Sequence, residues 1–456
     1  MPQEQRSGSV APTLRSWSKS RRFGATALLV ASGLAACTTS SDGGGPNPAD
    51  GSTDAGDSLD SNAPGDDAPT EAEAAPPDVV VPPDDVPAVD MGPPPGNAYC
   101  ALGTPIDGTS VPAGFCLRQF APIPEARTLA FAPNGDLFVG SPSTASVGGA
   151  SGGRGEILVL SDDDHDGVAE VATFASMVYD VHGIAIGGGY LYFTTTSTVF
   201  RTPYANGQRK ETGPREDLMM PAAFSTGRWT HGLARSVSGN LFTSIGQYAT
   251  CGSSAGGQIW QVPGAARTSL VATGFRNPMY MRCHFQDELC AANELGEDQM
   301  PGAREKLVAL RPATDYGYPC CYTADKPASG AAPGACASVM AENASYTLSD
   351  TPFGLDWERG KWPAPYKDGI FVALHGSFYS APRWAGAAIV YATTDVMSHL
   401  PNDNVWHPFV QGFGPQGSPL ERPADVAFAP DGRMFFADDQ GGAIYWVAPD
   451  ALARPN

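Results

Sequence analysis

The residues best suited to chemistry are a histidine and several cationic groups at the start of apolar segments. His231 precedes one such segment, Arg235 follows it by four positions, and Arg276-Asn277 opens a later segment. An imidazole accepts a proton near neutral pH, whereas a guanidinium stays protonated and contributes only charge and donors. We therefore expect cationic and amide donors to converge near His231. His182 also stands before a glycine, and for both histidines the alternative is a purely structural role.

A second set of candidate ligands is acidic. Asp162, Asp164 and Asp166 occupy alternate positions and are followed by Gly167. This spacing is typical of a calcium loop, in which alternate side chains converge on one ion and the glycine permits a sharp turn. Glu170 comes too early for the last ligand of an EF-hand. The sequence therefore supports two readings, a structural calcium site or a solvated acidic hairpin turn.

These residues belong to a repeated unit, a strand pair joined by a Gly, Asn or Asp turn. The six units begin near Thr128, His182, Thr230, Gly274, Pro352 and Pro423. Strand pairs repeated roughly every forty to eighty residues predict an all-β fold, a six-bladed β-propeller over residues 99–449, followed by a tail at 450–456. The alternative is a β-sandwich. We expect Phe115 to Phe120 to supply the outer strand that closes the last blade and removes the free sheet edges.

The chain before this domain differs in composition. Residues 1–36 combine basic residues with an apolar run and end in small residues before Cys37, which predicts a bacterial lipoprotein signal peptide; the alternative is a plain signal peptide cleaved nearby. Residues 37–98 are rich in Asp, Pro, Ala and Gly, contain no Lys or Arg, and predict a disordered acidic tether. We therefore expect an exported protein of the bacterial cell envelope, periplasmic or in the outer membrane, held to the membrane by an N-terminal lipid anchor.

The tether also carries most of the formal net charge of −20, so the acidic balance implies no basic partner and no nucleic acid. Eight cysteines follow Cys37, and an even number in an exported chain predicts disulfides. Proximity pairs Cys100 with Cys116 and Cys283 with Cys290. Cys320 and Cys321 are expected to pair elsewhere, with Cys251 and Cys336 as the remaining partners. The absence of any CxxC pair makes a metal-binding framework the weaker reading.

A series of short motifs runs through the whole globular region. The motifs are His231-Gly232-Leu233-Ala234-Arg235, Gly274-Phe275-Arg276-Asn277-Pro278, Asn293-Glu294-Leu295-Gly296, Asp315-Tyr316-Gly317-Tyr318-Pro319, His375-Gly376-Ser377 and Glu421-Arg422-Pro423-Ala424-Asp425-Val426. In this order the series resembles the pyrroloquinoline quinone (PQQ) dependent glucose and sorbosone dehydrogenase family. The resemblance implies a six-bladed propeller that oxidises a small-molecule sugar with PQQ and calcium and passes electrons to an external acceptor.

The resemblance also implies roles for the matching residues. His231 would take the proton from the C1 hydroxyl of an aldose or a related hydroxy-aldehyde while hydride leaves C1 for the cofactor. Arg276 and Asn277 would hold the cofactor oxygens, with Arg276 also stabilising negative charge during catalysis. Arg422 would cover a cofactor carboxylate or ring face, and Arg235 is placed beside them as a further cofactor-binding cation. The backbone carbonyls of Gly296 and Glu297 would bind the catalytic calcium.

Several positions depart from the family pattern. Ala424 stands where the family has an arginine, Ala387 and Ala388 stand where relatives tend to carry Tyr-Lys, and Glu297 replaces a proline. Each missing cation weakens the hold on a tricarboxylate cofactor by about 1–3 kcal/mol if the lost pair is buried. The alternative function is therefore a cofactor-less propeller that binds a glycan or a protein partner.

Overall fold

The computed structural model describes residues 98–103, 105–143, 153–218, 220, 231–252, 256–262, 269–296, 303–377 and 385–454. The predicted signal peptide, Cys37 as the predicted lipidation site and all of the predicted tether except Ala98 lie outside these residues, as does Glu297. Among the residues described, no helix is both long enough and apolar enough to cross a membrane.

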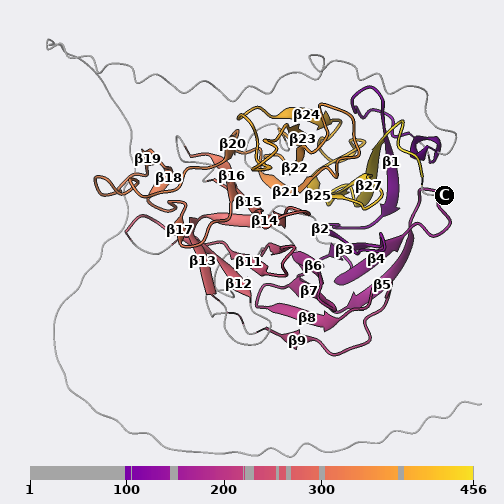
Figure 1. Ribbon diagram of the computed structural model, residues 1–456, viewed down its shortest axis with the longest axis horizontal. Helices are drawn as coiled ribbons and strands as arrows, with labels where there is room; N and C mark the ends of the chain where they lie inside the picture. Colours follow the sequence, from indigo (N-terminus) through magenta and orange to yellow (C-terminus); the bar gives the residue numbers. More distant parts are fainter. Residues whose placement is uncertain are drawn as a thin grey trace, which may run out of the picture. The chain divides into compact units, whose positions relative to one another are not determined.

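Six antiparallel sheets surround a central axis, with the first strand of each sheet innermost (Figure 1). The first blade consists of β2 (Thr128–Phe131), β3 (Leu137–Ser141), β4 (Glu156–Ser161) and β5 (Glu170–Ser176). The second consists of β6 (Gly183–Gly187), β7 (Tyr190–Thr194), β8 (Val199–Pro203) and β9 (Glu216–Asp217). The third consists of β10 (Leu233–Arg235), β11 (Leu241–Ile245), β12 (Gly257–Val262) and β13 (Ser269–Phe275), extended by the parallel strand β17 (Thr314–Asp315).

The remaining blades follow the same plan. The fourth consists of β14 (Asn277–Cys283), β15 (Cys290–Leu295), β16 (Glu305–Ala309) and β20 (Ala344–Tyr346). The fifth consists of β21 (Pro352–Trp357), β22 (Ile370–Leu374), β23 (Ala388–Ala392) and β24 (His407–Val410). The sixth consists of β25 (Pro423–Phe428), β26 (Met434–Asp438), β27 (Ala443–Pro449) and β1 (Phe115–Pro122). The predicted six-bladed propeller is confirmed.

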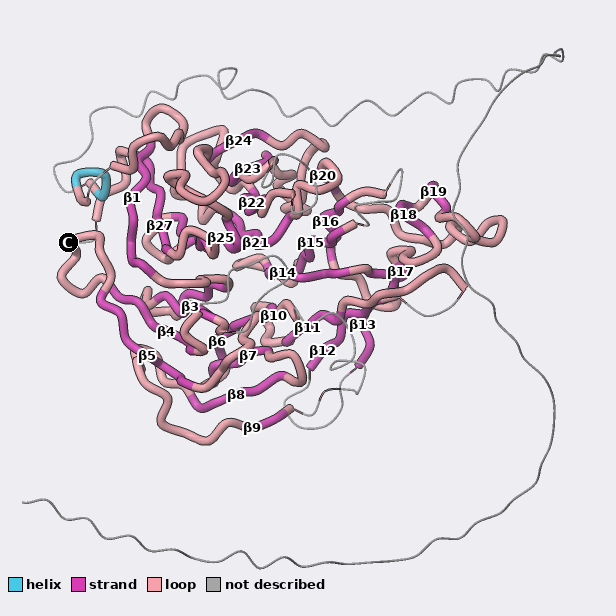
Figure 2. Tube along the Cα trace, turned by 180° about the vertical axis from the view of Figure 1, so that it is seen from behind, coloured by secondary structure: helices cyan, strands magenta, loops and turns pink. Residues whose placement is uncertain are grey.

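The last blade joins the two ends of the domain. Strand β1 pairs antiparallel with β27, from Phe115 opposite Pro449 to Pro122 opposite Ala443. The short helix η2 (Tyr99–Ala101) lies beside β1, where it is visible in cyan in Figure 2. A separate hairpin, β18 (Cys321–Thr323) with β19 (Lys326–Pro327), lies outside the blades. The predicted closure by the segment from Phe115 is therefore confirmed, with β1 as the outermost strand of the sixth sheet.

The hydrophobic cores lie between neighbouring blades because each sheet has apolar side chains on both faces. Between the fifth and sixth blades, Phe371 meets the edge of Phe409 and packs against Phe428, with ring centroids 5.0 and 5.2 Å apart. Phe371, Trp357 and Trp446 have no exposed surface. Burial of each such side chain contributes about 1.5–3 kcal/mol. Packing of this kind fixes the angle between blades and so positions the ends of the inner strands.

Two disulfides, Cys100–Cys116 and Cys283–Cys290, confirm the pairs predicted by proximity. The sequence left open which of Cys251 and Cys336 pairs with Cys320 and which with Cys321. The four disulfides among the described residues are Cys100–Cys116, Cys251–Cys320, Cys283–Cys290 and Cys321–Cys336. The first ties η2 to β1, and the third closes the turn between β14 and β15. The other two anchor the segment that carries β18 and β19. Such bonds persist in an oxidising compartment, which agrees with the predicted export.

Candidate active site

The six inner strands contact one another in a closed ring around the axis. Because every blade starts from its inner strand, these strands all begin at the same end of the axis. One residue just before each inner strand lies at this end: Arg127, His182, His231, Arg276, Thr351 and Arg422. All of them except Thr351 are buried. Three guanidinium groups and two imidazoles thus gather at one end of the propeller, which we call the charged ring.

His231 has the tautomer that a general base requires. Its Nδ1 lies 2.8 Å from the backbone carbonyl oxygen of Ser244. Because a carbonyl can only accept a hydrogen bond, Nδ1 carries a proton, and in the neutral imidazole the lone pair is therefore on Nε2. Thr194 Oγ1 donates to the backbone carbonyl of His231 at 2.7 Å, and Ser244 Oγ accepts from the N–H of Gly232 at 2.8 Å. These bonds fix both the backbone and the ring of His231.

His182 lies beside His231 in the neighbouring blade. A Cβ added at Gly183 would lie 3.0 Å from the carbonyl oxygen of His231, so the two strand starts approach as closely as a glycine allows. Burial, with further contributions from Arg127 and His231, lowers the pKa of His182 well below its ordinary value. His182 is therefore neutral at physiological pH. Arg127, His182 and His231 form one continuous arc of the ring.

A second group of residues surrounds the ionised carboxylate of Asp439. His375 Nε2 donates to Asp439 at 3.0 Å, and the Arg127 guanidinium lies 3.4 Å from the same carboxylate. Burial alone would raise the pKa of Asp439, but His375, Arg127 and Arg422 hold it below its ordinary range. Burial and the charge of Arg422 lower the pKa of His375 to about 3, so this imidazole is neutral. The ring of Phe353 stacks on it at 3.9 Å.

Two buried carboxyl groups lie close to the ring cations. Glu125 is 4% exposed, and neither of its carboxylate oxygens has a hydrogen-bond partner among the described residues. Burial raises the pKa of Glu125 to about 7, with Asp439 adding to the effect. Glu294 accepts from the backbone N–H of Arg276 at 2.6 Å, and burial raises its pKa to about 7 as well. Both groups therefore exchange protons near neutral pH.

Sequence reasoning missed Glu125, Arg127 and Asp439. Arg127 stands in the first unit where His182 stands in the second, and Asp439 follows β26 as His375 follows β22. The repeat frame could have found both residues by position. No sequence motif marks Glu125. Only the structure shows that it is buried near Arg127 and Asp439.

The predicted cofactor-binding residues Arg276, Asn277 and Arg422 lie at the starts of inner strands, but their contacts differ. Arg276 and Asn277 lie at the start of β14, with Glu294 orienting their backbone. Arg422 also belongs to the ring, but its Nε and Nη2 donate to the carbonyls of His375 and Gly376 at 2.9 and 3.2 Å. This guanidinium therefore holds the backbone after β22 in place.

Arg235 is wrongly placed by the sequence argument. Four positions along an extended chain carry a residue roughly 13 Å, so Arg235 lies at the opposite end of β10 from His231. Its guanidinium packs on two turns so closely that a Cβ added at Gly187 or Gly239 would clash with its nitrogens. Arg235 lines a cavity of about 150 Å³ at the far end of the axis. It does not join the charged ring.

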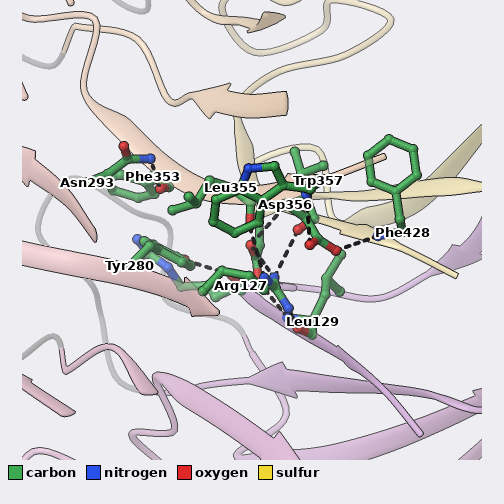
Figure 3. A network of polar contacts seen from close by, with 12 residues as sticks. Arg127, Leu129, Tyr280, Asn293, Phe353, Leu355, Asp356, Trp357 and Phe428 are labelled. Atoms are coloured by element: carbon green, nitrogen blue, oxygen red, sulfur yellow. Dashed lines mark hydrogen bonds and ion pairs between the residues drawn. The ribbon is translucent and has the colours of Figure 1, made fainter. Parts of the chain in front are cut away.

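Arg282 closes the axis between the ring and this far cavity. Its guanidinium donates to the carbonyls of Leu355 at 2.9 Å and Leu129 at 3.2 Å, and to Asp425 at 3.0 Å. Figure 3 shows Leu129, Leu355 and Phe428 approaching this network from three inner strands. Burial raises the pKa of Asp425 to about 6, against the opposing charge of Arg282, so the carboxylate is ionised at pH 7. The pair binds four blades together at the axis.

Of the two predicted calcium sites, the structure describes all three aspartates of the first but only one residue, Gly296, of the second. Asp162, Asp164 and Asp166 offer oxygens that all lie within 4.8 Å of one another in the turn between β4 and β5. Asp162 also pairs with Arg433 at 3.2 Å, and Asp164 and Asp166 accept backbone N–H groups of the turn. Gly296 follows β15 directly, and a Cβ there would clash with the carbonyl of Arg304. Glu297, the other half of the catalytic calcium prediction, lies outside the described residues.

Comparison with known proteins places this arrangement in a class of folds. No family model and no curated protein matches the sequence. A structure of a Trichoderma reesei protein of Carbohydrate-Active Enzymes family AA12 is similar, with 16% identity, a TM-score of 0.61, and coverage of 75% of this chain and 97% of that one. The soluble aldose sugar dehydrogenase of Escherichia coli, in its apo-form, has 16% identity and a TM-score of 0.51, with coverage of 74% and 99%.

A glucose dehydrogenase structure gives 16% identity, a TM-score of 0.52, and coverage of 73% of this chain and 98% of that one. The chain thus has the propeller fold found in glucose and aldose sugar dehydrogenases. At this level of identity, the likeness shows the fold, and the chemistry has to be argued from the charged ring.

Proposed function

We propose that this protein is an oxidoreductase that removes hydride from C1 of an aldose or a related hydroxy-aldehyde, with His231 as the general base. The observation that carries the proposal is the hydrogen bond from His231 Nδ1 to the Ser244 carbonyl. This bond leaves Nε2 as a proton acceptor beside the ring cations. The fold shared with sugar dehydrogenases supports the same assignment.

The residues of the ring suit an anionic cofactor. Arg127, Arg276 and Arg422 contribute three positive charges, whereas Asp439 contributes one negative charge, and Glu125 and Glu294 are only partly ionised near neutral pH. Such a surplus of positive charge is what a tricarboxylate such as PQQ requires. Ala424 is completely buried and adds no charge, so the hold depends on the three arginines.

When bound, PQQ would supply the hydride acceptor. Arg276 and Asn277 would hold it, with Glu294 fixing their backbone, and Arg422 would keep the segment after β22 in place. His231 would accept the proton of the C1 hydroxyl at Nε2. Neutral His182, next to His231, would add no competing positive charge. The buried setting of these groups excludes water from the proton transfer.

The other parts of the proposal concern location and metals. We propose an exported, lipid-anchored enzyme of the cell envelope, since four disulfides suit an oxidising compartment. Calcium would bind at the carbonyls of Gly296 and Glu297, and a structural calcium at Asp162, Asp164 and Asp166. An external acceptor would remove the electrons.

Reconstitution with PQQ and calcium, followed by dye-linked turnover with aldoses, tests the proposal. We expect His231→Ala to lower kcat by about 10² to 10⁴ while cofactor affinity stays nearly unchanged. Arg276→Ala should weaken both, and His182→Ala is the matched histidine control. If His182→Ala abolishes turnover and His231→Ala does not, the base is assigned to the wrong blade. If the wild type shows no turnover with saturating PQQ, the protein is a binding module.

A further inference from the structure

Away from the axis, two imidazoles and a carboxylate meet between the fourth and fifth blades. His284 and Asp287 lie in the turn that joins β14 to β15, and His399 lies in the connection from β23 to β24. The candidate ligand atoms of the three side chains all lie within 4.8 Å of one another. The imidazoles stack face to face, with ring centroids 4.0 Å apart. Neither the charged ring nor the proposed reaction uses this cluster.

The distances within the cluster fit ligands of a single ion. His284 Nδ1 lies 3.3 Å from one oxygen of Asp287, and His399 Nε2 lies 3.2 Å from the other. Two ligand atoms bound to one tetrahedral zinc ion at its usual bond lengths stand roughly 3.3 Å apart. Buried His284 Nδ1 has no hydrogen-bond partner among the described residues, so the Asp287 contact does not satisfy it.

The backbone segments that carry the three ligands are held in place before any ion binds. The disulfide Cys283–Cys290 closes the turn that carries His284 and Asp287. The backbone N–H of Leu289 donates to Asp287 Oδ1 at 2.9 Å. His399 adopts a left-handed backbone conformation with φ of 53°, which is uncommon for a non-glycine residue and persists only where the surroundings impose it.

Two hydrogen bonds to the His399 backbone impose this left-handed conformation. Its N–H donates to the carbonyl of Asp395 at 2.8 Å, and Trp357 Nε1 donates to its carbonyl at 2.7 Å. The same indole meets the His284 ring edge-on at 5.4 Å. Trp357 therefore positions both imidazoles, one through a hydrogen bond and one through packing.

The charges near the cluster also permit a cation. The neighbouring guanidinium, Arg359, pairs with Asp356 at 2.9 Å and lies over the ring of Phe285. Asp287 is 39% exposed and His399 is 21% exposed on their side chains, so the cluster is open to solvent.

We propose that His284, Asp287 and His399 form a binding site for a divalent transition-metal ion of the zinc type. Two imidazoles and one carboxylate are the ligands that such ions prefer, and a hard ion such as magnesium or calcium prefers oxygens alone. Water would occupy the fourth position. The ion would link the fourth and fifth blades across the surface between them.

Isothermal titration of the chelator-treated, tag-free full-length protein with zinc chloride tests the site, with excess calcium present to occupy acidic clusters. We expect one zinc ion per chain in the wild type. Asp287→Asn and His399→Gln should each lower the affinity by roughly 100-fold or more, beyond what loss of a group that merely supports a ligand costs. His407→Gln, which changes a half-buried histidine elsewhere in the fifth blade, should bind zinc as the wild type does.

Thermal unfolding supplies a second readout. Zinc should raise the unfolding temperature of the wild type and of His407→Gln but not of Asp287→Asn, and magnesium should raise none of them. The proposal is overturned if the wild type takes up no stoichiometric zinc, or if Asp287→Asn and His399→Gln both bind it as tightly as the wild type. The two exposed ligands are chosen for substitution because His284→Asn would also remove a buried ring.

Discussion

Glu125 gives the sharpest test of the electrostatics in the charged ring. Burial raises its pKa from an ordinary 4.5 to about 7, although Arg127 and Arg422 oppose the rise. The folded state therefore holds this proton more tightly than the unfolded state does. The stabilising contribution is complete below about pH 4.5 and is lost as the pH rises to about 7. At 1.36 kcal/mol per pH unit, the loss amounts to about 3 kcal/mol.

Glu125→Gln removes this pH dependence because an amide does not ionise. We expect the variant to match the wild type within about 1 kcal/mol at pH 4.5 and to become progressively more stable than it, by up to about 3 kcal/mol, at pH 8. Other titrating groups, such as Glu294 and His375, are the same in both proteins and cancel in the difference. Urea denaturation of both proteins from pH 4.5 to 8 measures it.

The control is an exposed carboxylate with the opposite behaviour. Hydrogen bonds from Ser236 and Ser238 lower the pKa of Glu288. Its contribution is present above the unfolded pKa and is lost as the pH falls, so Glu288→Gln should show a small difference of the opposite sign. If Glu125→Gln instead becomes less stable than the wild type as the pH rises, the arginines outweigh burial. In that case Glu125 is a fixed anion, and our account of the ring is refuted.

Two further substitutions test the axis. Asp425→Asn leaves the largely buried Arg282 guanidinium without the carboxylate that it contacts, so we expect a loss of about 3–5 kcal/mol in the free energy of unfolding, measured in urea; a loss below about 1 kcal/mol would mean that the carbonyl acceptors of Leu129 and Leu355 suffice. Arg235→Ala should leave kcat and PQQ affinity of the reconstituted protein unchanged, because Arg235 lies at the far end of the axis; a loss of turnover equal to that of His231→Ala would contradict this placement.

The blades could be predicted from the sequence because the signals for a strand pair are local. Alternating apolar residues and a turn glycine, as in Leu241–Ile245 after Gly239, specify a hairpin without reference to distant parts of the chain. Repetition of that signal gave the number of blades. Two disulfide pairs could be predicted for a similar reason, since their cysteines are close in sequence, whereas the pairing of Cys251, Cys320, Cys321 and Cys336 depends on the folded chain and stayed open.

The site was harder to predict because its contacts are not local. The error over Arg235 arose from counting four positions as proximity, which holds on a helix but not along a strand. Glu125, Arg127 and Asp439 belong to the beginning and the end of the domain, and their meeting depends on the complete propeller. Nothing in the local sequence of any one of them indicates the other two.

Closure of the sixth blade therefore does more than add an outer strand. Pairing of β1 with β27 brings the first and last blades together, and Asp425 in the last blade then accepts the backbone N–H of Leu129 in the first at 2.8 Å. The same juxtaposition places Arg127 against Asp439 and brings Glu125 near both. The charge that would hold an anionic cofactor thus exists only in the closed ring. In this fold, the strand that stabilises the propeller also completes the candidate active site.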